Sequence, residues 1–366
     1  MSWSDIQGHD RWVEWFREVV RRGRLAHAYL FVGPPGVGKH RFAMELAKAL
    51  LCERNKPHEF DACDDCEACH YVNANTHPDL FIVEKPSEDS DEPVWTISKT
   101  PVPHPDRPDE RRSDVFPIHV MRELCRLVGN KPARSRGRVA ILVEAELLNH
   151  EPPAAASCFL KTLEEPPPHS VFILIGTSLE GQLPTIRSRC QIIRFAPLPE
   201  DTVRSILAKH ELADPNLIPR IVKLAAGSPG QAIDLAEPEL WKFRNRLLQG
   251  FGQPKVDTVG LAKSFVDFVE EAGKETVNQR RRAALVLKLL MKAWSDALAL
   301  RLSGPAASAP AEETALLQPL AQRTQPDQIL RLLERCLEAE TQLDRYVQVG
   351  LVVEALVDAL GRIVDP

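Results

Sequence analysis

The stretch Gly33–His40, GPPGVGKH, decides the fold class of this chain. It follows an apolar run typical of a buried strand, Ala28–Val32, and precedes Arg41–Leu51, whose apolar residues recur at helical spacing. A strand, a glycine-rich loop and a helix in this order predict a phosphate-binding loop, whose backbone N–H groups surround nucleotide phosphates. A Gly/Pro-rich turn that binds nothing is the less favoured alternative.

The loop departs from the active form of the motif at its last position. Gly33, Gly36, Gly38 and Lys39 keep the residues that surround phosphates, but His40 stands where a Ser or Thr hydroxyl would hold Mg²⁺. Mg²⁺ requires oxygen ligands in octahedral geometry, and an imidazole is a poor replacement. We therefore predict a site that can bind ATP or ADP weakly but supports little magnesium-dependent hydrolysis.

A second group that ATP hydrolysis requires is also missing. An acidic residue should end a neighbouring buried strand and help to hold the metal ion. The best candidate strand is Val139–Val143, and Val143 stands where an active enzyme usually has Asp. Glu144 could orient a water molecule, but both oxygens that would hold the metal are absent. The two departures together indicate a site that has lost its own catalysis.

Four of the eight cysteines lie close together in the sequence: Cys52, Cys63, Cys66 and Cys69. Four thiolates at such intervals can surround a tetrahedral Zn²⁺ and leave no open position for catalysis. We therefore predict a structural zinc module over residues 52–69, with a redox pair or unrelated thiols as alternatives. One sulfur could also be replaced by a nearby histidine, although each of these is expected at the surface: His58, His70 and His77.

Composition limits the kinds of partner. The 366 residues are enough for two or three domains, and a net charge of −5 gives no global basic signature. Contact with nucleic acid must therefore be local or supplied by partners. The chain has no run of 18 apolar residues and no charged-then-apolar amino-terminal segment, which predicts a cytoplasmic protein outside the membrane.

Strand and helix patterns alternate through the first half of the chain. Apolar strands are expected at 80–83, 139–143, 171–175 and 191–195, with helices at 120–128 and 154–165. This alternation predicts a parallel sheet covered on both faces. Residues 84–113 are rich in proline and acidic side chains, and they are expected to form a flexible insertion.

Only helical periodicity remains after Glu200. Short helices are expected at 201–210 and 217–226, and longer amphipathic ones from 239 to the end, interrupted by a Pro/Ala/Ser linker at 303–311. Such helices either form an ordinary core or present one face to other subunits.

Several stretches, taken in order, carry a resemblance to a known family. They are Arg24–Phe31 (RLAHAYLF), the phosphate-binding loop, the four cysteines, His77–Leu80 (HPDL), Phe159–Pro167 (FLKTLEEPP) and Arg187–Cys190 (RSRC). Their order and spacing resemble the bacterial DNA polymerase III clamp loader family, which belongs to the AAA+ class. The resemblance covers residues 1 to about 240 and is weak in the helical tail and the acidic insertion.

The resemblance implies an architecture and a set of partners. It implies a P-loop α/β domain over 1–196, a helical lid over 197–238 and an all-α collar over 239–366 that joins five subunits. The implied partners are clamp loader subunits of the gamma, tau and delta types, the sliding clamp, and primed DNA through the complex.

The resemblance also implies roles for three residues outside the loop. Thr177 lies near a nucleotide-sensing position at a strand end, and Gly230 replaces the lid arginine of active subunits. Arg189 is similar to the arginine finger that each subunit extends into its neighbour's nucleotide site, although by its local chemistry it is an ordinary surface arginine.

We therefore expect a stator that does not hydrolyse ATP itself but serves a neighbour's hydrolysis. An active gamma- or tau-type ATPase is the first alternative. Another AAA+ machine, such as a branch-migration helicase, is the second, and the cysteine cluster beside the loop argues against it.

Overall fold

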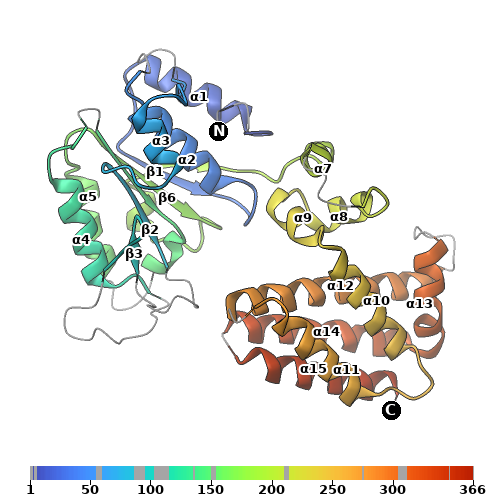
Figure 1. Cartoon of the computed structure of the whole chain (residues 1–366). Helices are drawn as coiled ribbons and strands as arrows, with labels where there is room; N and C mark the ends of the chain where they lie inside the picture. The colour runs from blue at the N-terminus through green and yellow to red at the C-terminus, as the bar shows by residue number, and fades with distance from the viewer. Residues whose placement is uncertain are drawn as a thin grey trace. The chain divides into compact units, whose positions relative to one another are not determined.

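The computed structural model divides the chain into two compact units, residues 1–233 and 234–366 (Figure 1). The residues that it describes are Trp3, 6–54, 60–85, 95–102, 115–134, 137–149, 154–209, 214–273, 276–303, 311–345 and 347–365.

A sheet of seven strands, counted among the described residues, organises the first unit in the order β4-β3-β2-β5-β6-β1-β7. The strands are β1 (Ala28–Val32), β2 (Leu80–Glu84), β3 (Thr96–Ile97), β4 (Thr100–Pro101), β5 (Arg138–Leu142), β6 (Ser170–Gly176) and β7 (Gln191–Arg194). Five of them, from β2 to β7, pair in parallel, with Leu30 opposite Leu174 on one side and Ile192 on the other. This arrangement confirms the predicted parallel sheet.

Helices cover both faces of this sheet because its central strands are apolar on both sides. Tyr29 and Phe31 of β1 point into a core shared with α1 and α2, whereas Leu30 points into the opposite core with α4 and α5. Figure 1 shows α1 and α2 on one side of the sheet and α4 and α5 on the other. The helices are α1 (Asp10–Arg21), α2 (Lys39–Leu51), α3 (Glu67–Asn73), α4 (Ile118–Gly129), α5 (Ala154–Glu164) and α6 (Pro184–Arg187).

Part of the expected flexible insertion joins the sheet. Residues 95–102 form the β3–β4 hairpin, and β3 pairs antiparallel with β2. Ile97 is buried, and the ring of Trp95 lies 4.5 Å from that of Phe116. The expectation of a flexible segment was therefore wrong for 95–102, because two apolar side chains find a place in the core. Residues 86–94 and 103–113 of the insertion lie outside the described residues.

Three short helices complete the first unit or cross into the second: α7 (Glu200–Lys209), α8 (Ile218–Ala225) and α9 (Pro229–Leu235). The second unit contains α10 (Pro238–Phe251), α11 (Thr258–Glu270), α12 (Thr276–Ser303), α13 (Ala311–Arg323), α14 (Pro326–Asp344) and α15 (Val349–Val364). The fold class, an α/β sheet domain followed by an all-α domain, is confirmed. The division at 233 does not separate the expected lid from the sheet, so the boundary at 196 stays a prediction.

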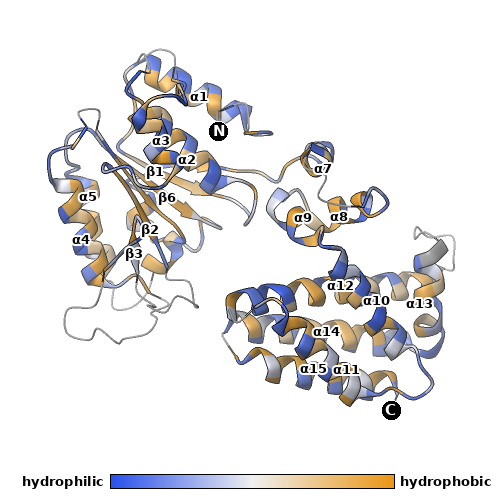
Figure 2. Cartoon of the chain, viewed as in Figure 1, coloured by the Kyte–Doolittle hydropathy of each residue, from blue (hydrophilic) through white to orange (hydrophobic). Residues whose placement is uncertain are grey.

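The helices of the second unit are amphipathic. In α15, Val349, Val352, Val353 and Leu356 are buried, at the three- and four-residue spacing of one helix face. Figure 2 shows the corresponding apolar and hydrophilic sides on the helices of this unit. Of the predicted linker 303–311, Ser303 ends α12 and Ala311 begins α13, and residues 304–310 lie outside the described residues.

Candidate functional site

In the predicted phosphate-binding loop, Gly33–Gly38 connect β1 to α2, and Lys39 and His40 are the first two residues of α2. Gly36 and Gly38 have φ values of 74° and 102°, which side chains other than glycine rarely adopt. Lys39 is only 7% exposed, and its Nζ donates hydrogen bonds to the carbonyl oxygens of Gly33 and Pro34, the latter at 2.7 Å. Burial lowers the pKa of Lys39, and the charge of Glu146 opposes that shift. The lysine is therefore held by carbonyl oxygens of its own loop.

His40 faces a carboxylate on another element. Its Nε2 lies 3.7 Å from Oε1 of Glu84, at the end of β2. The nearby His40 imidazole holds the pKa of Glu84 below its usual value. The imidazole thus contributes a nitrogen, and no hydroxyl oxygen, at the position where the motif normally holds Mg²⁺.

The acidic residues after β5 are arranged differently from the sequence expectation. The strand ends at Leu142, and Glu144 is exposed in a left-handed conformation. The carboxylate of Glu146 accepts hydrogen bonds from the backbone N–H and, at 2.8 Å, from the hydroxyl of Thr177. Thr177 therefore has a structural partner that sequence reasoning missed, since 31 positions separate the two residues.

The turn before α9 packs against the loop by backbone contact. Gly230 N–H donates to the carbonyl of Gly36, and the Ser228 hydroxyl donates to the carbonyl of Pro35, both at 2.9 Å. A Cβ atom at position 230 would lie 2.9 Å from Cα of Gly36, closer than real Cβ contacts. The position implied for a lid arginine therefore has no room for any side chain in this arrangement.

A histidine near the amino terminus supports the loop from another side. His9 is buried, and its Nε2–H donates to the carbonyl of Val37 at 2.7 Å. Its ring meets that of Phe195 edge-on at 4.8 Å between centroids. Burial lowers the pKa of His9, opposed by its hydrogen bond to Val37 and by the charge of Asp10. Sequence reasoning missed this residue because it precedes the loop by more than one element.

The four predicted cysteines come together. The Sγ atoms of Cys52, Cys63, Cys66 and Cys69 all lie within 4.8 Å of one another, and those of Cys52 and Cys66 are 3.9 Å apart. Four sulfurs about 2.3 Å from a tetrahedral Zn²⁺ have a similar spacing. The cluster can therefore hold a metal ion such as zinc.

Local structure positions these sulfurs and favours thiolate at one of them. Cys52 caps the end of α2, and Cys66 caps the start of α3 and accepts the N–H of Cys69 at 3.5 Å. Burial raises the pKa of the Cys66 thiol, but N–H groups of Cys69 and Glu53 outweigh it and lower the pKa to about 6. Thiolate is the form that binds metal.

The alternative histidine ligands are not part of the described cluster. His77 is buried, not at the surface as expected, and its Nδ1 accepts the N–H of Asp79. His70 is exposed, and His58 lies outside the described residues.

Arg189 lies just before β7, at the end of a turn that follows α6. Its side chain is 32% exposed. The guanidinium contacts Glu164 at the end of α5, the carbonyl of Thr185 at 3.0 Å and the hydroxyl of Ser188 at 3.2 Å. Among the described residues, these contacts of Arg189 do not include any residue of Gly33–His40.

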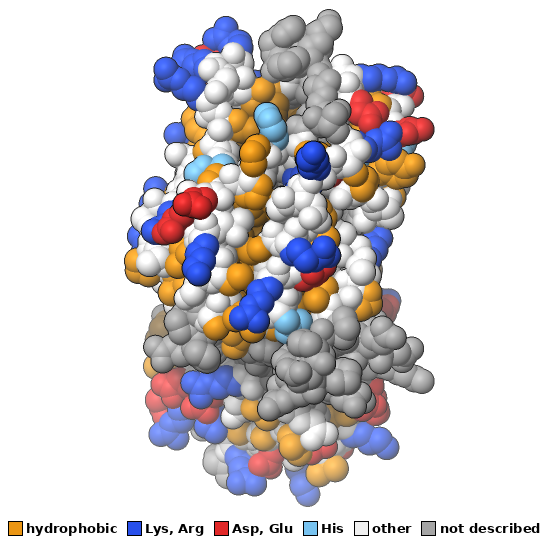
Figure 3. Space-filling model, turned by 90° about the vertical axis from the view of Figure 1, so that its left-hand side faces the viewer, with side chains coloured by type: hydrophobic (Ala, Val, Ile, Leu, Met, Phe, Trp, Pro, Cys, Tyr) orange, Lys and Arg blue, Asp and Glu red, His pale blue; other side chains and the backbone are white. Residues whose placement is uncertain are grey.

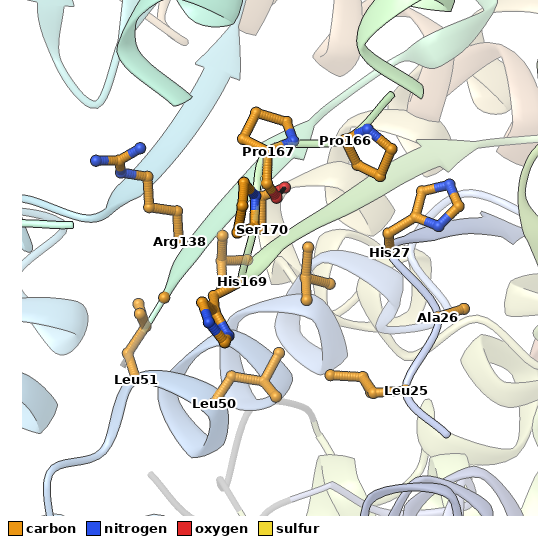
Figure 4. A pocket seen from close by; sticks show the side chains of 14 residues that line it. Leu25, Ala26, His27, Leu50, Leu51, Arg138, Pro166, Pro167, His169 and Ser170 are labelled. Carbon is orange, nitrogen blue, oxygen red and sulfur yellow. Dashed lines mark hydrogen bonds between the residues drawn. The ribbon is translucent and has the colours of Figure 1, made fainter. Parts of the chain in front are cut away.

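A cavity of about 400 Å³ lies at the other end of the sheet, beside the residues that precede β1, β5 and β6. Figure 4 shows Leu25 and Leu50 on one side of it and Pro166 and Pro167 on another, with the Arg138 guanidinium directed away. Arg138 instead donates to the carbonyl of Val128. None of the loop residues Gly33–His40 lines this cavity.

The surface over α4 and α5 has no single dominant charge. Figure 3 shows Lys and Arg side chains on this side of the molecule separated by uncharged surface. None of the described helices is both long and apolar enough to cross a lipid bilayer.

Comparisons with known proteins give the family. A family model described as "DNA polymerase III, delta subunit" matches residues 8–199, slightly more than half of the chain. The DNA polymerase III subunit delta' of Escherichia coli K12 is 28% identical over 246 residues, which cover 65% of each protein. The subunit delta' of Pseudomonas aeruginosa is 33% identical over 234 residues, covering 63% of this chain and 61% of that protein.

A gamma/tau subunit from Mycoplasma pneumoniae is 31% identical over 208 residues, which cover 57% of this chain and 26% of that subunit. The matches to the two delta' relatives each span less than two thirds of the relative's own length. The family model nonetheless covers the sheet, the loop, the cysteine cluster and Arg189. The chain belongs to the DNA polymerase III delta subunit family of clamp loader proteins, and its relatives include subunits of the delta' type.

Proposed function

We propose that this chain is a delta'-type clamp loader subunit, a stator that does not hydrolyse ATP by itself. It acts in the cytoplasm in a hetero-pentamer with gamma- or tau-type and delta-type subunits, and it helps to place the sliding clamp on primed DNA. Arg189 acts in trans on a neighbour's ATP, and the four cysteines hold a structural zinc ion.

The observation that carries the proposal is the chemistry around the loop. His40 offers a ring nitrogen and lies beside Glu84, and the Val143 side chain has no oxygen, so neither side chain supplies a magnesium ligand. Lys39 is bonded to carbonyls of its own loop, and Gly230 has no space for a side chain against Gly36. Any ATP or ADP that binds would lack the metal contacts on which phosphoryl transfer depends.

The same features argue against an active gamma- or tau-type ATPase. That alternative needs Mg²⁺ held at positions 40 and 143, and neither residue fits. A branch-migration helicase is disfavoured by the cysteine cluster, which a family match over residues 8–199 includes.

Arg189 is suited to work across an interface. An arginine offered in trans neutralises charge on the transferring phosphoryl group and is worth about 10³–10⁵ in rate. Its planar fork of donors matches phosphate geometry, which a lysine ammonium does not. Because the Arg189 side chain is 32% exposed and its partner Glu164 is 50% exposed, a neighbour's phosphate could approach it.

Two measurements test the proposal. The purified chain alone should show no appreciable magnesium-dependent ATPase activity, and robust turnover would overturn the stator assignment. The loader reconstituted with wild-type partners, the clamp and primed DNA should lose ATPase rate when it carries Arg189→Ala, mainly in kcat and less in KM.

The matched control is Arg187→Ala. Arg187 is an exposed arginine at the end of α6, two residues before Arg189, and its removal should leave the rate unchanged. Arg189→Lys should rescue poorly. If the Arg189→Ala complex hydrolyses ATP at the wild-type rate, Arg189 is an ordinary surface arginine.

A further inference from the structure

Arg189 is restrained by its own subunit through three acceptors. Nη2 donates to Oε1 of Glu164, and Nη1 donates to the Thr185 carbonyl and the Ser188 hydroxyl. Thr185 lies in α6 and Ser188 directly after it, so both are within four residues of Arg189 in the sequence. Glu164, in contrast, belongs to another element. It is the last residue of α5, 25 positions before Arg189, and strand β6 lies between the two in the sequence.

These contacts leave part of the guanidinium available. An arginine has five N–H donors in a rigid plane. Three are used by the described partners, so two remain for an external anion. The guanidinium can therefore bind a phosphate while its hydrogen bonds to Glu164, Thr185 and Ser188 remain in place.

The restraint has a physical use. A free arginine side chain loses much rotamer freedom when it binds, and a catalytic contact depends on orientation within a fraction of an ångström. A carboxylate from a helix end fixes the direction of the guanidinium before any neighbour arrives. The Thr185 and Ser188 acceptors both contact Nη1, whereas Glu164 contacts Nη2, so the carboxylate adds a restraint at the opposite side of the planar group.

We propose that Glu164 is a positioning residue for Arg189, which it orients for the neighbouring subunit's phosphate. This inference rests on the proposed function, in which Arg189 acts in trans.

Glu164 is expected to contribute little to folding stability, so a change in ATPase rate on its substitution can be separated from a loss of folded protein. The side chains of Arg189 and Glu164 are 32% and 50% exposed, and ion pairs at such sites add little to stability. Substitution of Glu164 should therefore leave the melting temperature, the zinc content and assembly of the complex unchanged. Any effect on rate then reports on orientation.

The experiment is a double-mutant cycle on the ATPase of the full reconstituted loader. Glu164→Ala should lower kcat about threefold to tenfold, less than the about 10²-fold that misplacement by an ångström can cost, with KM for ATP unchanged. Glu164→Gln keeps an acceptor oxygen and should lose less. Glu165→Gln, at the exposed neighbouring position, is the matched control and should have no effect.

The cycle separates positioning from other roles. Combined with Arg189→Ala, the Glu164→Ala change should cause no additional loss, since the group that it orients is gone. Additive losses would show that Glu164 acts independently and would overturn the inference. A faster rate in Glu164→Ala would also overturn it, because Glu164 would then restrain Arg189 from use.

Failure of the inference can be told from failure of the proposed function. If Arg189→Ala lowers the rate and Glu164→Ala does not, only the role of Glu164 is wrong. If Arg189→Ala itself has no effect, the action of Arg189 in trans is wrong, and the inference falls with it.

Discussion

Nζ of Lys48 lies 2.6 Å from Oδ1 of Asp64 and 2.9 Å from Oε2 of Glu45. Lys48 is on α2 and is 1% exposed, whereas Asp64 belongs to the segment that carries the cysteine cluster. Helix α2 begins at the phosphate-binding loop and ends at Cys52, so one helix joins the loop to the cluster. The cluster segment thus supplies Asp64, one of the two carboxylates just named, to the buried ammonium.

Removal of the metal should therefore destabilise the first unit. We expect about one zinc per chain by elemental analysis, and a melting temperature lower by about 5 °C or more after chelation. About 1 kcal/mol already shifts a domain of this size by about 2–4 °C. Cys66→Ser should lose the metal, whereas Cys158→Ser, outside the cluster, should retain it. Protein prepared without chelator and free of metal would rule out the zinc site.

Gly230→Ala should destabilise the chain because its Cβ would collide with Gly36. We expect a loss of about 1–3 kcal/mol in the free energy of unfolding, as for other overpacked sites. Gly350→Ala is the matched control, since both glycines lie in the first turn of a helix and a Cβ at 350 meets nothing within 4 Å. That change should be neutral or stabilising by up to about 1 kcal/mol. Equal effects in urea unfolding would contradict the close packing at 230.

His9 should make stability depend on pH. Its folded-state pKa is lowered by burial, so the unfolded chain, with a pKa of about 6.5, binds more protons in the window below that value. The contribution of His9 is fully present above pH 6.5 and is lost as the pH falls toward the folded pKa. His9→Gln keeps a donor for the Val37 carbonyl but does not titrate. The difference in unfolding free energy between pH 7.5 and 5.5 should thus be smaller in His9→Gln, and an identical difference would show that His9 is not responsible.

The helical second unit should drive association. Its described helices carry exposed apolar side chains, such as Leu330, Leu337 and Leu351, that have no obvious use in a lone chain. A chain that ends near Ala236 should keep its zinc and a cooperative melting transition but bind its clamp loader partners much more weakly. Analytical ultracentrifugation with the partners tests this. Assembly of the truncated chain at full affinity would exclude the role of the tail.

The sequence predicted the elements well because apolar periodicity is a local signal. The strand at Ala28–Val32 has the expected bounds, and α5 ends one residue before the expected position. The cysteine cluster was also predictable, since three of its members lie within seven residues of one another.

Side-chain partners across the fold could not be predicted in the same way. Glu146 with Thr177 and Glu164 with Arg189 are separated by 31 and 25 positions, and only packing of the sheet and helices brings them together. The β3–β4 hairpin was missed because its proline-rich and acidic surroundings outweighed two apolar residues, Trp95 and Ile97, in the composition. Each of these features depends on contacts between residues that are far apart in the sequence.

The backbone contact of Gly36 with Gly230 bears on how such a chain changes over evolution. A mutation that gave either position a side chain would cost stability whether or not a nucleotide ever entered the loop. Selection on folding alone would thus preserve a glycine at position 36, whether or not the loop served catalysis. At His40 the described contact is a half-exposed pair with Glu84, so a substitution there would cost folding little.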